Sequence, residues 1–156
     1  MFPSLTGYGW NGSRYYDLDT GRFVSNSDVL GALESVIDQS AINMNALSTQ
    51  LQNGEISLAS WQSSMMQEIK ISHLASTTAA NGGWAQMTPS DWGFAGSQIK
   101  EQYQYLNNFA QQIANGEQPL DGRFMVRTDL YGDAVRDSYE AQRFRLMEGL
   151  GMEEEL

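Results

Sequence analysis

The fold of this chain is decided by residues 25–54, which read SNSDVLGALESVIDQSAINMNALSTQLQNG. The stretch opens with side-chain oxygens that can cap a helix N-terminus, and Asn53-Gly54 closes it in the manner of a left-handed C-cap. Between these ends, apolar and small residues recur at steps of three and four: Val29, Leu33, Val36, Ile37, Ser40, Met44, Leu47 and Leu51. This spacing predicts one long amphipathic helix.

Three more helices follow from the same kind of signal. Ser57 can cap a second helix, and Thr88, with Pro89 in the first helical position and Asp91 three residues after the cap, predicts a third that ends at Asn115-Gly116. A fourth is predicted from about residue 123. The apolar stripes of the second, third and fourth helices are Leu58, Trp61, Met65, Ile69 and His73; Ile99, Tyr103, Leu106, Phe109, Ala110 and Ile113; and Leu130, Ala134, Val135, Tyr139, Leu146 and Leu150. We expect an all-α fold, an antiparallel bundle or two helical hairpins, because short connections favour antiparallel neighbours.

The two ends of the chain are expected to differ from this helical domain, which we place at residues 25–150. Residues 1–24 are rich in glycine and aromatic residues and lack helical periodicity, so they predict an extended arm. Within the arm, 14–18 and 22–24 flank a turn and predict one short β-hairpin. Residues 151–156 predict an acidic C-terminal tail that frays.

Composition limits the classes of function. The chain has 9 basic and 19 acidic residues, a formal net charge of −10, so its average field disfavours direct, sequence-specific binding of nucleic acid. It contains no cysteine, which removes disulfides and thiolate chemistry. Neither a signal peptide nor a membrane span is expected, so we predict a soluble chain without membrane contact.

The residues that could carry chemistry form no complete site. His73 is the single histidine and lies on an apolar stripe, which favours a partly buried structural role over acid–base or ligand chemistry. The segment 17–21, DLDTG, resembles the opening of a calcium loop, but the later ligands are missing and a β-turn is favoured. We therefore predict no enzyme activity, no catalytic or metal-binding residues and no cofactor.

Candidate contact residues are aromatic or basic. Only 18% of residues are charged, and protein interfaces are depleted of charge in this way. Five aromatic residues lie in the arm or between the second and third helices and are candidate anchors for a partner: Phe2, Tyr8, Trp10, Trp84 and Trp92. For the tryptophans between helices, capping of the bundle end is an equally good interpretation.

Arginines are concentrated in the last helix. Arg127 and Arg136 are the candidate contacts among them, as part of a subunit-contacting stripe. The alternative is a solvated, salt-bridged face, in which Arg136 pairs with Asp133 and Glu140 at helical spacing.

Several stretches together resemble a known family. They are 16–24 (YDLDTGRFV), 53–61 (NGEISLASW), 81–83 (NGG), 87–93 (MTPSDWG), 102–110 (QYQYLNNFA) and 127–134 (RTDLYGDA). Over residues 14–145 the chain is similar to the helical body of tailed-bacteriophage head-morphogenesis proteins, the minor head or MuF-like family. Many relatives continue into a segment with cysteine and histidine, and a metal-bound role of that segment is not carried over to this cysteine-free chain.

The resemblance implies a non-enzymatic virion structural or assembly protein. It would contact capsid, portal or connector proteins and form a homo-oligomer in the assembly. Its location would be the head or neck of the virion, and the host cytoplasm during assembly. Two alternatives stay open: a small phage enzyme, such as a wall-degrading hydrolase, and a module that captures a host protein through residues 84–92.

Overall fold

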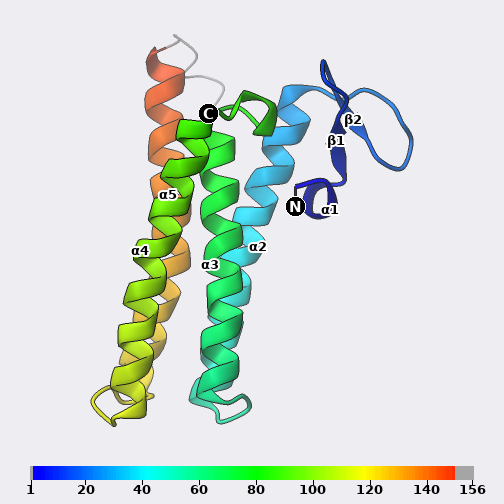
Figure 1. Cartoon of the computed structure of the whole chain (residues 1–156). Helices are drawn as coiled ribbons and strands as arrows, with labels where there is room; N and C mark the ends of the chain where they lie inside the picture. The colour runs from blue at the N-terminus through cyan, green and yellow to red at the C-terminus, as the bar shows by residue number, and fades with distance from the viewer. Residues whose placement is uncertain (1, 150–156) are drawn as a thin grey trace.

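The computed structural model describes residues 2–149, with the side chains of residues 129, 130 and 142–149 left out. Four long helices form the body: α2 (Asn26–Gln52), α3 (Leu58–Ala80), α4 (Pro89–Ala114) and α5 (Gly122–Gly149). They run alternately down and up the molecule (Figure 1). The predicted all-α antiparallel bundle is confirmed. The acidic tail predicted at 151–156 lies outside the described residues, and so do the side chains of Leu130, Leu146 and Leu150.

The predicted helix ends are confirmed by their caps. The Ser25 side chain accepts a hydrogen bond from the Asp28 backbone N–H, and the Asp28 carboxylate accepts one from the Ser25 backbone N–H. Thr88 and Asp91 repeat this reciprocal pair at the start of α4. Gly54 and Gly116 follow α2 and α4 with φ values of 73° and 74°, in the left-handed region that glycine tolerates. Both turns lie at the same end of the bundle (Figure 1).

The core has two parts along the length of the bundle. One cluster lies near the start of α2 and the other near the two glycine turns. In α2 and α3 the positions between the clusters are buried but polar, at Ser40, Ser72 and His73. The first cluster contains Phe2, Tyr15, Val29, Leu33, Ile37, Ala75, Ala79 and Tyr139. The second contains Met44, Leu51, Trp61, Met65, Ile69, Leu106, Ala110 and Phe124.

Packing between the helices is unequal. α2 packs against both α3 and α5, and α3 also packs against α4. At the α2–α5 contact, a Cβ on Gly132 would lie 2.9 Å from the Cα atom of Ala41, so only glycine fits without moving a helix. Further along this contact, the Tyr139 hydroxyl donates to the Glu34 carboxylate at 2.7 Å.

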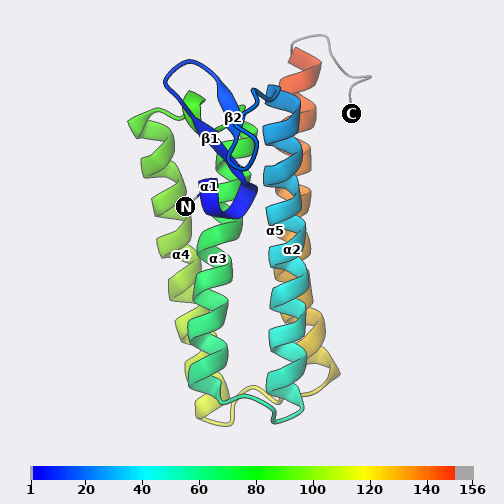
Figure 2. The same cartoon turned by 90° about the vertical axis from the view of Figure 1, so that its right-hand side faces the viewer.

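The N-terminal segment is folded onto the bundle. It comprises a short helix α1 (Phe2–Thr6) and the strands β1 (Tyr8–Trp10) and β2 (Tyr15–Asp17), which pair antiparallel. It lies beside the end of the bundle where α2 begins (Figure 2). Because Phe2 and Tyr15 belong to the first core cluster, residues 2–24 share a core with the helical domain.

These contacts correct the expectation of an extended arm. The segment is too short to show periodicity, but its aromatic side chains pack against apolar residues of the bundle. The hairpin expected between 14–18 and 22–24 is reduced to one bridge, Tyr16 with Phe23, and the strand that pairs with β2 is β1. A short connecting 3₁₀ helix, η1 (Trp84–Gln86), lies between α3 and α4 and was not predicted.

Candidate functional site

A groove runs between α4 and α5, and residues of α3 and α4 form its floor. We call it the α4–α5 groove, and its volume is about 480 Å³. The floor is apolar, formed by Trp61, Met65, Ile69, Leu106 and Phe109. The walls and rim are polar or aromatic, formed by Gln102, Tyr105, Asn108, Gln112, Gln118, Arg127, Thr128 and Tyr131. A concave site with an apolar floor and a few polar groups on its rim is typical of a binding site.

Three aromatic rings in mutual contact support the floor, two of them stacked and the third, Trp61, tilted against both. The Trp61 indole lies 6.2 Å from the Phe109 ring and 5.8 Å from the Phe124 ring, measured between centroids. Phe109 and Phe124 stack on each other at 5.7 Å. The buried Trp61 Nε1–H donates to the Ser48 hydroxyl at 3.3 Å. The rings are therefore held by α2, α3, α4 and α5 together.

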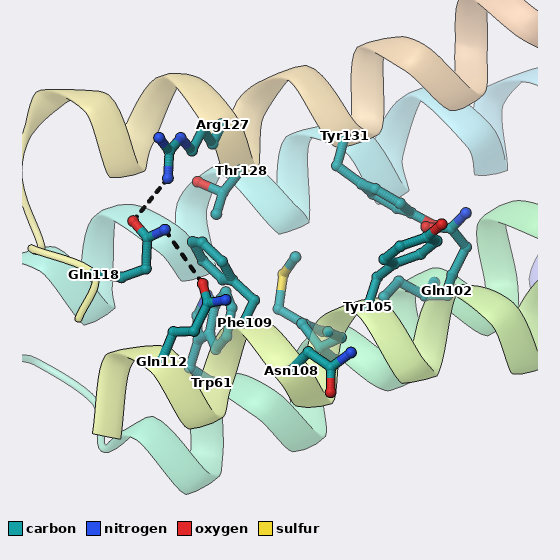
Figure 3. Close-up of a pocket in the computed structure, with 13 residues that line it drawn as sticks. Trp61, Gln102, Tyr105, Asn108, Phe109, Gln112, Gln118, Arg127, Thr128 and Tyr131 are labelled. Carbon is teal, nitrogen blue, oxygen red and sulfur yellow. Dashed lines mark hydrogen bonds between the residues drawn. The ribbon is translucent and has the colours of Figure 1, made fainter. Parts of the chain in front are cut away.

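Hydrogen bonds link α4 and α5 at one end of the groove (Figure 3). The Arg127 guanidinium donates to the Gln118 Oε1 atom at 2.7 Å. The Gln118 Nε2–H in turn donates to the Gln112 Oε1 atom at 3.3 Å. Tyr105 and Tyr131 lie at the opposite end (Figure 3). The groove is thus bounded along the bundle axis.

The wall residue Tyr131 is coupled to the single histidine. Its hydroxyl lies 2.6 Å from the Nε2 atom of His73, across the α3–α5 contact. Burial lowers the pKa of His73 and raises the pKa of Tyr131. Both groups are therefore neutral near pH 7, and a hydrogen bond joins the imidazole to the tyrosine hydroxyl. The pair fixes a wall of the groove, which agrees with the structural role expected for His73.

The His73 environment predicts acid sensitivity. In the unfolded chain the imidazole titrates near pH 6.5. Burial lowers its pKa in the folded chain, so below pH 6.5 the unfolded state binds more protons and is favoured. We expect the free energy of unfolding to be constant above about pH 7.5 and to fall towards pH 5.5, by at most about 1.4 kcal/mol per pH unit. Urea denaturation at a series of pH values measures this.

The matched control is His73→Gln, because the chain has one histidine and ordinary carboxylates titrate below this window. The variant should remove the pH dependence between 5.5 and 7.5. An unchanged slope in His73→Gln would assign the acid sensitivity to other groups.

The electrostatics of the groove contrast with those of the chain. Arg127 is the one charged residue among those that line it, and no carboxylate does. The chain as a whole has a formal net charge of −10. The lining of the groove therefore carries one positive charge and no negative charge.

The predicted aromatic anchors occupy a different place, at the end of the bundle near α1. The Phe2 ring stacks on Trp84 at 5.5 Å and on Trp92 at 6.1 Å. Tyr15 joins Trp84 to Trp10, with ring centroids 4.8 Å apart in each pair. We call these five residues the aromatic cluster.

The cluster attaches the N-terminal segment to the bundle. The Tyr15 hydroxyl accepts a hydrogen bond from the Ala85 backbone N–H at 2.8 Å. Phe2 is buried, whereas Trp10 and Trp92 stay 37% and 39% exposed. Tyr8 is half-buried against the first core cluster. Capping of the bundle end accounts for Phe2 and Trp84, and contact with a partner stays a prediction for the exposed rings.

The two candidate arginines are not brought together. Arg127 lines the groove, whereas Arg136 faces α2 and pairs with Asp133 at 2.8 Å, as its helical spacing predicted. Arg136 also lies 4.0 Å from Asp38. The acidic segment 17–21 forms the expected turn, in which the Asp17 carboxylate accepts from the backbone N–H groups of residues 19 and 20. Among the side chains that the structure describes, no group of three or more acidic, histidine or cysteine residues is arranged to hold a metal ion.

Most residues of the groove were missed by the sequence analysis. The sequence analysis assigned no site role to Tyr105, Gln112, Gln118 or Tyr131, because the groove depends on the distance between α4 and α5. One signal was present: Phe94 and Tyr105 are eleven positions apart and therefore share a helix face, and both are exposed. That pattern could have marked an unburied apolar face on α4.

Comparisons with known proteins identified no relative of this chain. No protein-family model matches the chain, and searches of curated proteins and of solved structures found no significant match. Among the helices described in residues 2–149, none has the length and hydropathy needed to cross a membrane.

Proposed function

We propose that this chain is a non-enzymatic structural or assembly protein of a tailed-bacteriophage particle. It works as a minor head, portal- or capsid-associated component, and it binds neighbouring shell proteins and copies of itself through helix surfaces. Its place is the head or neck of the virion, and the host cytoplasm during assembly. The family resemblance suggests the particle, and the face of α4 supports the mode of action.

The proposal depends on the exposed aromatic residues on one face of α4. Phe94 and Tyr105 are 54% and 61% exposed and share one face of this helix. The face continues into the α4–α5 groove, which carboxylates do not line. The same face carries one exposed carboxylate, that of Glu101, between the two rings. Exposed aromatic residues are typical of protein-binding sites.

The test is association with shell proteins in solution. The purified full chain is mixed with the capsid and portal proteins of the same phage and analysed by size-exclusion chromatography with light scattering. We expect a mixed complex or a ring-sized oligomer. The double variant Phe94→Ala, Tyr105→Ala should weaken that complex at least tenfold, because both rings leave the contact face.

Ile42→Ala is the matched control. Ile42 is an exposed apolar residue of α2, on a helix that does not border the groove, and it is 60% exposed. Its replacement should leave the complex unchanged. A chain that stays monomeric, binds neither shell protein and is missing from purified particles would overturn the proposal. Capture of a host protein or a hydrolytic activity would then decide between the alternatives.

A further inference from the structure

We propose that the α4–α5 groove binds a peptide segment that carries a large apolar side chain next to a carboxylate. The apolar side chain would rest on the partly exposed ring of Phe109, which packs on the buried Trp61, and the carboxylate would pair with Arg127. This inference rests on the proposed function, since it names the chemistry of the partner segment.

The dimensions of the groove favour a compact group. Its volume of about 480 Å³ falls in the range of about 300–1,000 Å³ typical of ligand sites. The Arg127–Gln118–Gln112 hydrogen bonds bound one end, and Tyr105 and Tyr131 stand at the other (Figure 3). A groove bounded at both ends receives an inserted side chain more readily than the full length of a docking helix.

The positive charge of Arg127 favours a negatively charged ligand. A guanidinium has five N–H donors, and the hydrogen bond to Gln118 uses one of them. The remaining donors suit a carboxylate, and none of the residues that line the groove carries one. Glu117 and Asp121 line a separate, adjoining pocket with Arg127. A polyanion such as nucleic acid would meet the repulsion of the whole chain, whose formal net charge is −10. A single carboxylate gains the local attraction while incurring little of that repulsion.

The rim suits a peptide backbone. Asn108 and Gln112 are exposed on α4 beside the apolar floor, and Gln102 stands near the tyrosines. Each side-chain amide can both donate and accept, as a peptide backbone requires of its partner. Together the floor, the amides and the arginine match the three parts of the proposed segment.

The experiment uses three small probes of this segment. They are N-acetyl-phenylalanine, which is an anion at pH 7, its neutral amide N-acetyl-phenylalaninamide, and N-acetyl-alanine. Each is titrated into the full ¹⁵N-labelled chain, and the indole N–H of Trp61 and the side-chain amides of the groove are followed by NMR. We expect the anion to bind about fivefold more tightly than the neutral amide, because it gains a charge-assisted hydrogen bond. N-acetyl-alanine should bind at least tenfold more weakly than N-acetyl-phenylalanine, because it lacks the aromatic ring.

Two variants that each remove one positive charge distinguish direct pairing with Arg127 from the effect of the net charge of the chain. Arg127→Gln should bring the affinities of the anion and the neutral amide to equality while the aromatic probe still binds. Lys100→Gln removes the same charge from an exposed position on α4 outside the groove lining, and should keep the fivefold preference.

Three results would overturn the inference: equal binding of the anion and the amide by the unmodified chain, a preference that survives in Arg127→Gln, or signal changes that map away from the groove. The outcome is separable from that of the proposed function. A chain that joins shell proteins but shows no preference for the anion refutes this inference alone. A chain that binds the anion through Arg127 but joins no shell protein refutes only the assembly role.

Discussion

Replacement of Trp61 by alanine is expected to lower the free energy of unfolding by about 3–5 kcal/mol. The side chain is completely buried, and its ring packs on Phe109 and Phe124. Its removal leaves a cavity at the junction of α3, α4 and α5 and leaves the Ser48 hydroxyl without the Trp61 N–H that it accepts. Chemical denaturation followed by circular dichroism measures the loss.

Two control variants test whether the loss of stability comes from the buried aromatic ring. Trp61→Phe keeps an aromatic ring in the floor and should cost clearly less than Trp61→Ala. Phe94→Ala removes an exposed aromatic ring of α4 and should change stability by no more than about 0.5 kcal/mol. If Trp61→Ala cost no more than Phe94→Ala, the floor of the groove would not be the packed junction described above.

Phe2→Ala is expected to have the second largest effect, a loss of about 3 kcal/mol, at the low end for a buried phenylalanine because the chain end can fray locally. Phe2 is 6% exposed and is stacked on Trp84 and Trp92. Without its ring, α1 loses its anchor on the bundle. Denaturation measures the global loss, and amide hydrogen exchange over residues 2–17 reports the detachment.

Leu5→Ala is the matched control, because Leu5 lies on the same short helix but is 39% exposed. It should leave both measurements nearly unchanged. The comparison also tests the sequence-based interpretation of Phe2 as a partner anchor. An anchor for a partner would weaken binding when replaced while leaving the stability of the isolated chain intact.

The helices were predictable because their signals are local. Ser25 with Asp28, and Thr88 with Pro89 and Asp91, fix two helix starts through contacts within four residues. The glycine turns at 54 and 116 end the preceding helices because left-handed backbone suits glycine. Hydrophobic spacing then assigns the inner faces. None of this needs knowledge of another helix.

The groove and the N-terminal packing were not predictable because they depend on distant residues. Tyr131 meets His73 across the α3–α5 contact, and Phe2 meets Trp84 after four intervening elements and Trp92 after five. A single sequence gives no register between such elements. Arg127 was singled out as a contact residue for its place in an arginine-rich helix, but its position beside Gln118 and a carboxylate-free groove emerged only from the fold.

The contact of α2 with α5 has a consequence for the order of folding. The α2–α3 pair is joined by a short glycine turn and can form early, since little chain entropy is lost in closing it. The Gly132–Ala41 contact joins the first long helix to the last and closes a far longer loop. During synthesis from the N-terminus, the α5-facing side of α2 therefore stays uncovered until nearly the whole chain has emerged. Docking of α5 is the step that completes the bundle, and until then the nascent chain is most exposed to misassembly with other copies.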